Sequence, residues 1–382
     1  MPFFPDMMPT MQAILDHLKA QTPAILADIE RLVRLESPSK DVPGINSVSD
    51  VVQSWLEPLG ACERIPHELG DTLRVVIPGR SSDRVVLLAH ADTVYSRGFW
   101  DNLWRVEGDK VFGPGAYDMK GGIVQAVWAL KTLKKLGLEL SHTVEFLLTP
   151  DEEIASHAGR PIIEASAVGA RAVLVLEPPH LNGDLKVARK GVGAYNVKIH
   201  GKAAHQGTEP ENGRNALVSA AHFIQEVVKL QDIPKGTTLG PNVIQGGTVS
   251  NVVCDLVELE VDLRVWTSEE ADRIEAAIHA IQPLEGTRYE ISDGLNRPAM
   301  EPTEGSLKVL ELGQKIAAEL GFHPGAARVG GGSDGNFTAK LAPTLDGFGV
   351  HGANAHQRNL EYILISELAP RTALIAGMLS RI

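Results

Sequence analysis

This 382-residue sequence has little of several features that would place it in a class at once. It has only two cysteines, Cys62 and Cys254, which argues against a disulfide framework and against a zinc site built on thiolates. No apolar run reaches the roughly 18 residues of a membrane-spanning helix, so no membrane partner is expected. The N-terminal segment Met1–Asp6 has neither a positively charged stretch nor a long apolar one. We therefore expect a cytoplasmic protein.

Positive charge is also scarce. Lysine and arginine number 36 against 48 aspartates and glutamates, a formal net charge of −12. Non-specific nucleic-acid binding needs a basic surface, so a nucleic-acid partner is not expected. The apolar fraction of 43% is ordinary for a globular protein, and the length allows two domains or one large one.

Three apolar segments each end in acidic or imidazole side chains: Val85–Asp92, Val144–Glu153 and Arg171–Glu177. Continuous apolar segments are typical of strands buried on both faces of a parallel sheet. Ligands of open α/β sheets bind beyond the carboxyl ends of the strands, and charged groups there are costly to bury unless paired or bound to metal. The pattern predicts a metal site built from His90, Asp92, Glu152, Glu153 and Glu177.

The alternation of helical and strand patterns through the first half predicts an α/β fold. We expect a mixed, mostly parallel sheet with helices on both faces. Farther along, Tyr195–His200 and Val257–Val265 alternate apolar and polar residues with period two, which is typical of a half-exposed antiparallel sheet. The predicted organisation is a catalytic domain in two parts, 1–189 and 296–382, interrupted by an inserted α+β domain, 190–295.

The glycine-punctuated loop Gly113–Gly122 opens a helix predicted over Lys120–Lys135. Within it, Asp118 could cap the helix N-terminus. Alternatively, Asp118 could span two cations, because paired metals lie roughly 3.5–4 Å apart, a distance that one carboxylate can bridge. The loop has neither Gly-Lys-Ser/Thr nor the spaced Gly-x-Gly-x-x-Gly, so nucleotide binding is rejected.

The adjacent carboxylates Glu152 and Glu153 repel each other at a buried strand end unless cations compensate. Neighbours on an extended chain point in opposite directions, so one could ligate metal while the other acts on the substrate as a general base. An exposed acidic turn is the alternative. In His90-Ala91-Asp92, Asp92 could orient a metal-binding imidazole, or the two could form a buried polar pair.

Together, these motifs resemble the M20 metallopeptidase family over nearly the whole chain. The resemblance rests on His90-Ala91-Asp92, Gly115–Gly122, Asp151-Glu152-Glu153, Glu177-Pro178 and His356. The family comprises di-zinc aminopeptidase-like hydrolases, among them glutamate carboxypeptidase, succinyl-diaminopimelate desuccinylases and acetylornithine deacetylases.

The resemblance implies two Zn²⁺ per subunit, with Co²⁺ or Mn²⁺ as alternatives. By position, His90 and Glu177 would bind one metal, and Glu153 and His356 the other, with Asp118 bridging both. Glu152 would be the general base and Asp92 the partner of His90. His351 is an alternative to His356 as a metal ligand. His356 is favoured because Glu361-Tyr362 follows it shortly afterwards.

The inserted domain also matches the family. The segment His200–His205 resembles a lid in which the second histidine, His205, stabilises the tetrahedral intermediate in the partner subunit's active site, which implies a homodimer. The two period-two strands are expected to leave an edge that pairs with its copy. The segment Gly246–Val253 resembles one whose asparagine, Asn251, contacts substrate. Cys254 stands where the family usually has proline.

The residues predicted to bind the substrate are mainly cationic. Lys190, Arg264 and Arg297 lie where glutamate carboxypeptidases hold substrate carboxylates, although each alone could be a surface charge. Gly331 opens a Gly-Gly-Ser-Asp-Gly run whose amides could bind a carboxylate, and its Ser-Asp-Gly is also similar to desuccinylases.

The predicted reaction is hydrolysis of an amide in a small peptide, releasing a C-terminal amino acid, glutamate or a relative. An N-acyl-amino-acid deacylase acting on N-acyl amino acids is the alternative enzyme. A catalytically dead binding protein on the same scaffold would have lost Glu152 or a ligand, and none is lost.

Overall fold

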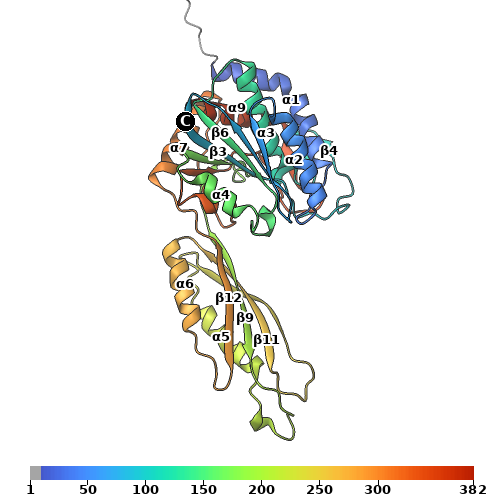
Figure 1. Cartoon of the computed structure of the whole chain (residues 1–382), viewed down its shortest axis with the longest axis vertical. Helices are drawn as coiled ribbons and strands as arrows, with labels where there is room; N and C mark the ends of the chain where they lie inside the picture. Colours follow the sequence, from blue (N-terminus) through green and yellow to red (C-terminus); the bar gives the residue numbers. More distant parts are fainter. Residues whose placement is uncertain (1–9) are drawn as a thin grey trace, which may run out of the picture. The chain divides into compact units, whose positions relative to one another are not determined.

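The computed structural model describes residues 10–382, so the segment Met1–Asp6 considered above lies outside it. The chain forms two compact units (Figure 1). The first comprises the chain up to Val187 together with Pro302–Arg328 and Ser333–Ile382. The second comprises Ala188–Glu301 and Val329–Gly332.

The first unit is built on an eight-stranded sheet in the order β1-β2-β6-β3-β7-β14-β8-β13. Its middle strands β6, β3, β7 and β14 run parallel. On one side β1 pairs antiparallel with β2 and β2 with β6, and on the other β8 pairs antiparallel with β14. This confirms the predicted mixed α/β class. The strands are β1 (Ala61–Ile65), β2 (Thr72–Ile77), β3 (Ser81–His90), β6 (His142–Thr149), β7 (Ala172–Val175), β8 (Leu185–Arg189), β13 (Ala326–Val329) and β14 (Thr344–Asp346).

Helices cover both faces of this sheet (Figure 1). Successive strand residues point to opposite faces. Accordingly, Val85 and Leu87 of β3 belong to the core shared with α1, α3 and α9, whereas Val86 and Leu88 pack with α4 and α8. The helices are α1 (Met11–Val33), α2 (Val42–Leu56), α3 (Gly121–Lys135), α4 (Arg160–Ala167), α7 (Glu304–Glu319), α8 (Gly335–Thr338) and α9 (Ile365–Arg381).

A small second sheet of the first unit joins distant parts of the chain. It has the order β15-β16-β5-β4, from β4 (Arg105–Glu107), β5 (Lys110–Phe112), β15 (Gly352–Ala353) and β16 (Tyr362–Leu364). Tyr362 pairs with Phe112. This pairing links the segment that contains His356 to the segment that leads into the Gly113–Gly122 loop.

The second unit is an antiparallel sheet in the order β10-β11-β9-β12 with two helices. The predicted edge is wrong, because β9 and β11 are the interior strands and β10 and β12 are the edges. Period-two alternation reports which face of a strand is buried, not which neighbours it pairs with. The elements are β9 (Gly191–His200), β10 (Thr238–Gly246), β11 (Leu256–Val265), β12 (Arg288–Arg297), α5 (Ala216–Lys229) and α6 (Ser268–Ala280).

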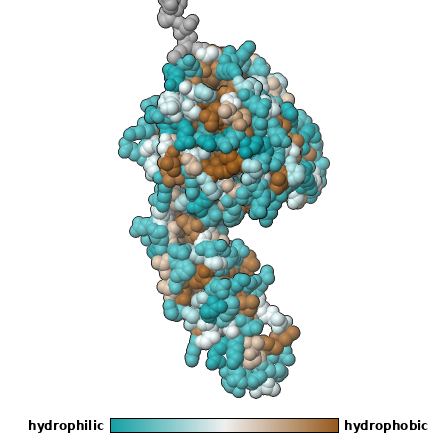
Figure 2. All heavy atoms as spheres, viewed as in Figure 1, coloured by the Kyte–Doolittle hydropathy of each residue, from teal (hydrophilic) through white to brown (hydrophobic). Residues whose placement is uncertain are grey.

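Among residues 10–382, no helix combines the length and the apolar character needed to cross a membrane. The visible face of the molecule mixes hydrophilic and hydrophobic side chains (Figure 2).

Candidate metal centre

The acidic and imidazole residues of the first unit meet beyond the carboxyl ends of its parallel strands. His90 ends β3, and Glu177 follows β7 by two residues. Glu152 and Glu153 form a short turn after β6, Glu152–Ile154. Asp118 comes from the turn Ala116–Lys120 that precedes α3, and His356 from the loop between β15 and β16.

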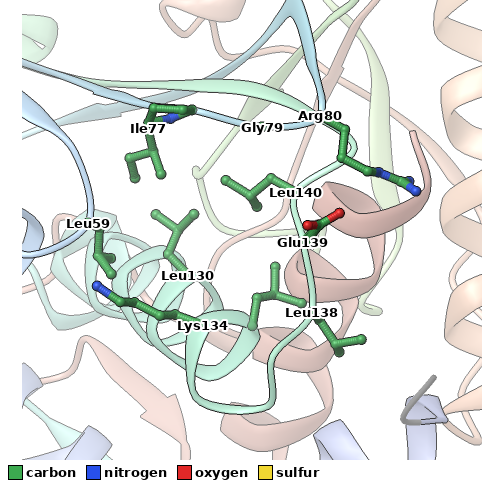
Figure 3. Close-up of a pocket in the computed structure, with 11 residues that line it drawn as sticks. Leu59, Ile77, Gly79, Arg80, Leu130, Lys134, Leu138, Glu139 and Leu140 are labelled. Carbon is green, nitrogen blue, oxygen red and sulfur yellow. The ribbon is translucent and has the colours of Figure 1, made fainter. Parts of the chain in front are cut away.

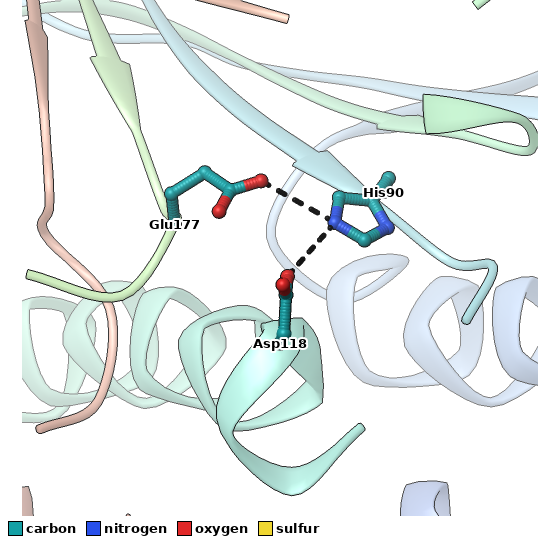
Figure 4. A group of neighbouring side chains, drawn as sticks. All are labelled: His90, Asp118 and Glu177. Atoms are coloured by element: carbon teal, nitrogen blue, oxygen red, sulfur yellow. Dashed lines mark ion pairs between the residues drawn. The ribbon is translucent and has the colours of Figure 1, made fainter. Parts of the chain in front are cut away.

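Two groups of three side chains could each hold a metal ion, and Asp118 belongs to both. In the first, His90 Nε2 lies 3.3 Å from Asp118 Oδ1 and 3.4 Å from Glu177 Oε1 (Figure 4). In the second, His356 Nε2 lies 3.3 Å from Asp118 Oδ2 and 3.6 Å from Glu153 Oε2. The two carboxylate oxygens of Asp118 thus face two different histidines.

Unpaired buried atoms make this arrangement suitable for cations. His90 Nε2, Asp118 Oδ1 and Glu153 Oε1 are buried and have no hydrogen-bond partner among residues 10–382. Such atoms are costly unless something satisfies them, and the three residues that carry them belong to the two groups of ligands. Imidazole and carboxylate donors without thiolates are a ligand set that Zn²⁺ accepts, as do Mn²⁺ and Co²⁺.

Proton affinities in the cluster reflect the crowding of carboxylates. Burial raises the pKa of Glu153 to about 7. Contacts with Asp118 and Glu153 raise the pKa of His356 to about 11. Burial alone would lower the pKa of His90, but Asp118, Asp92 and Glu177 outweigh it and raise that pKa well above its ordinary value. The histidines therefore stand in a strongly anionic environment, which favours a cation.

Asp92 contacts the Glu152-Glu153 turn as well as the His90 imidazole. Nδ1 of His90 lies 3.0 Å from the Asp92 carbonyl oxygen and 3.3 Å from its Oδ1. The Asp92 carboxylate also accepts the backbone N–H groups of Glu152 and Glu153, at 3.1 and 3.2 Å. These bonds hold the two glutamates in one turn of 3₁₀ helix. The expectation of an extended chain at Glu152-Glu153 is therefore wrong.

Asp118 does not cap α3, so that interpretation is also wrong. The residue before α3 is Lys120, which makes no side-chain cap bond. Gly122 lets the helix start close to the sheet, because a Cβ there would lie 2.2 Å from the Leu176 carbonyl oxygen. The Asp118 side chain is thus left to face His90 and His356.

Glu361 is a functional candidate that sequence reasoning used only as a marker for His356. It is fully buried and accepts hydrogen bonds from Tyr95 Oη at 2.7 Å, Tyr117 N at 2.9 Å and Asp118 N at 3.2 Å. Burial raises its pKa to about 8. Glu361 thereby holds the turn that presents Asp118. In the sequence, its position five residues after the predicted ligand His356 was the feature that could have indicated this role.

Two other residues near these motifs have different surroundings. Lys120 is buried, and burial lowers its pKa to about 8. Its ammonium has no hydrogen-bond partner among the described residues. His351 belongs to neither group of three, and its Nε2 lies 3.1 Å from the Leu181 carbonyl oxygen.

The second unit contains the other predicted site residues. His205 and Asn251 lie on neighbouring segments, since His205 bridges to Val252 and the Gln206 N–H donates to the Asn251 carbonyl. Both side chains are exposed. The Gly207 N–H donates to His205 Nδ1 at 3.1 Å. A neutral imidazole that accepts at Nδ1 has its proton on Nε2, where it can donate a hydrogen bond.

The predicted substrate cations lie at one end of the antiparallel sheet. Arg264 and Arg297 both align with Val192 of β9, one on each side. Arg297 is buried, whereas Arg264 is half-buried and bonds Asp262. Lys190 precedes β9 and donates to the Gly236 carbonyl.

The Gly331–Gly335 run is divided between structural contacts. The carbonyl of Gly331 accepts a hydrogen bond from Arg189 at 3.1 Å. Ser333 donates to Asp346 at 2.7 Å, and Thr149 donates to Asp334 at 3.1 Å. The side chains of Ser333 and Asp334 therefore form hydrogen bonds within the first unit.

An apolar pocket of about 350 Å³ lies at the amino ends of β3 and β6, away from the metal ligands (Figure 3). Its lining includes Ile77–Arg80 before β3 and Leu138–Leu140 before β6, whereas His90 is the last residue of β3 and Glu152 follows β6. Its lining contains one carboxylate, Glu139. An aliphatic lining of this kind does not supply metal ligands.

The chain is similar to known peptidases and amide hydrolases in both sequence and fold. The model of peptidase family M20/M25/M40 matches residues 86–381. Carboxypeptidase G2 of Pseudomonas sp. is 30% identical over 372 residues, covering 94% of this chain and 89% of that protein. Succinyl-diaminopimelate desuccinylase of Cupriavidus necator is 28% identical over 385 residues, covering 94% and 99%. Aminopeptidase PepT of Bacillus cereus has the same fold, with a TM-score of 0.79 at 23% identity, covering 94% of this chain and 98% of that one.

Proposed function

Because this chain belongs to peptidase family M20/M25/M40 and is a metallohydrolase, we propose that it is a di-zinc carboxypeptidase that releases a C-terminal glutamate or related amino acid. The observation that carries the proposal is the shared Asp118, whose two oxygens face His90 and His356 from two separate groups of ligands. A carboxylate between two cations is the arrangement expected of a two-metal hydrolase.

In this proposal His90, Asp118 and Glu177 hold one zinc, and Asp118, Glu153 and His356 hold the other. When bound, the metals would polarise the scissile carbonyl and lower the pKa of the attacking water. Asp92 keeps the His90 ring oriented through its contact with Nδ1.

Glu152 is the proposed general base. Its backbone is fixed by the bond from its N–H to Asp92, and it belongs to neither group of ligands. It would take the proton of the attacking water and give it to the leaving amine, so one carboxylate serves first as base and then as acid. His205 of the partner subunit would donate its Nε2 proton to the developing oxyanion.

A homodimer joined through the second unit completes the proposal. Exposed apolar side chains occur there on the edge strand β10 and on α5, and Figure 2 shows apolar patches on the visible face of this unit. Exposed apolar patches commonly mark protein–protein interfaces. The side chains are Val243, Ile244, Leu217 and Val218, which are 47%, 47%, 42% and 55% exposed.

Metal analysis tests the proposed centre. We expect the purified protein, loaded with Zn²⁺ and dialysed against metal-free buffer, to retain close to two equivalents per chain, because two groups of ligands share Asp118. Elemental analysis measures this directly. A protein that retains no metal and is fully active would contradict the proposal.

The substrate class needs a separate test, because the curated relatives include both a carboxypeptidase and desuccinylases. A panel of N-acyl peptides ending in glutamate, the same peptides ending in alanine, and N-acetyl and N-succinyl amino acids should be assayed with Zn²⁺. We expect the glutamate peptides to be preferred. Hydrolysis confined to N-acyl amino acids with free side-chain amines would favour the deacylase.

Arg297 is the proposed contact for the substrate side-chain carboxylate. Replacing Arg297 with Ala should raise the KM for C-terminal glutamate peptides by about 10–100-fold, because a hydrogen bond to a charged group contributes roughly 1.5–3 kcal/mol. Peptides ending in alanine should be affected little. Arg288→Ala, at the exposed end of the same strand β12, is the matched control. An equal loss on both substrates would exclude this role for Arg297.

A further inference from the structure

The segment Pro178–Gly183 follows Glu177 directly and is held by side chains from three distant parts of the first unit. Each donates to one of three alternate carbonyls of the segment. The contacts are Tyr117 Oη to Pro179 O at 3.3 Å, His351 Nε2 to Leu181 O at 3.1 Å, and Arg371 Nη2 to Gly183 O at 2.8 Å.

The sequence of this segment explains why it needs such donors. Glu177 lies beyond β7, which ends at Val175, and its carbonyl oxygen accepts a backbone hydrogen bond from Gly349 N at 2.9 Å. Pro178 and Pro179 have no backbone N–H and cannot anchor the chain by donating hydrogen bonds. The carbonyl oxygens of Pro179, Leu181 and Gly183 remain available, and they accept the three side-chain donors.

Arg371 is the most deeply buried of the three donors. It lies in α9 and is 2% exposed, and within the part of the chain that the structure describes its Nε and Nη1 have no hydrogen-bond partner. Glu367, one turn earlier, lies 3.4 Å from Arg371 Nε and 3.9 Å from His351 Nδ1. Burying a guanidinium with unsatisfied N–H groups is unfavourable for stability. A role in positioning would account for its presence.

Gly183 is shaped for this contact. Its φ of +89° is one that residues with side chains rarely adopt, and a Cβ there would lie 2.8 Å from Arg371 Nη2. The Tyr117 contact adds a second connection, since Tyr117 precedes Asp118. The same set of donors therefore connects the segment after Glu177 to the turn that presents Asp118.

We propose that Arg371, with His351 and Tyr117, is a positioning residue for the metal held by His90, Asp118 and Glu177, and that it acts by fixing the segment after Glu177. This inference rests on the proposed di-metal function. The contacts reach the Glu177 side of the centre, and Glu153 and His356 make none of them. Loss of the Arg371 contact should therefore weaken one metal site and spare the other.

The test is titration of metal-free full-length protein with Co²⁺, followed by its visible absorption, and with Zn²⁺ against a competing chelator. Partners that orient metal ligands typically change metal affinity by about 10–100-fold. For Arg371→Met we expect a loss of that size at one site and less than about 3-fold change at the other. The equivalent that remains should have the Co²⁺ spectrum of Glu177→Gln protein. Arg371→Lys, which restores a donor, should recover part of the affinity.

Arg381→Met is the matched control, because Arg381 lies on the same helix and pairs with Glu319 at the surface. His351→Leu keeps the buried arginine and removes one donor, so it serves if Arg371→Met does not fold, and the same selective loss is expected. Unchanged affinities, or equal weakening of both sites in a folded variant, would overturn the positioning role. Wild-type protein that binds no pair of metals would overturn the proposed function itself.

Discussion

Glu152→Gln is expected to lower kcat by about 10²–10⁴-fold, the usual contribution of a positioned general base. Glutamine preserves the size of the side chain and the backbone bond from residue 152 to Asp92, but it cannot accept the proton of the attacking water. Metal content should remain that of the wild type, because Glu152 belongs to neither group of metal ligands. Steady-state kinetics and elemental analysis of the same preparation measure both quantities.

Glu153→Gln is the matched control for this experiment. Glu153 Oε2 lies 3.6 Å from His356 Nε2, so its replacement should weaken metal binding as well as turnover. The two variants differ by one position in the same 3₁₀ turn and should fail in different ways. If Glu152→Gln loses metal while Glu153→Gln retains it, the two roles have been assigned the wrong way round.

His205→Ala should reduce kcat by about 10²–10³-fold, by analogy with the removal of other oxyanion donors. The Gly207 N–H donates to His205 Nδ1, so Nε2 is the ring nitrogen left to donate to the oxyanion, and the variant loses this donor. The residue is exposed in its own unit, and its removal should not affect the free energy of unfolding by more than about 0.5 kcal/mol. His279→Ala, an exposed histidine on α6, should leave kcat unchanged.

Mixing His205→Ala with Glu152→Gln subunits tests whether His205 acts across a dimer. In a mixed dimer, one site combines an intact Glu152 with an intact His205 from the partner, and the other site has neither. Activity should return on subunit exchange and approach half the normal rate per mixed dimer. Exchange demonstrated by mass, with no return of activity, would mean that His205 serves its own subunit or has no catalytic role.

The family and the mixed α/β fold could be predicted from the sequence because their signals are local. Apolar segments that end in His90-Ala91-Asp92, Glu152-Glu153 and Glu177 indicate buried parallel strands whose carboxyl ends bear ligands, and each can be recognised within about ten residues. The two cysteines likewise left imidazole and carboxylate as the only metal ligands to consider.

Features that depend on strand partners and backbone geometry could not be predicted from local sequence patterns. Alternation along Tyr195–His200 and Val257–Val265 predicts a buried face, yet both strands are interior because β10 and β12 pair outside them. The turn at Glu152-Glu153 depends on the Asp92 carboxylate, which accepts N–H groups from a segment 60 residues away.

The residue types that end the strands can be identified from the sequence alone, and they are enough to indicate the family and the kind of chemistry. How these residues are held is visible only in the folded chain. Asp118 faces two histidines, Glu361 holds the turn of Asp118 from 243 residues away, and Arg371 reaches Gly183 across 188 residues. The hydrogen-bond partners of buried groups are selected by the packing of the whole chain, so residues far apart in the sequence can be partners. Local periodicity reports only which side of each segment avoids water.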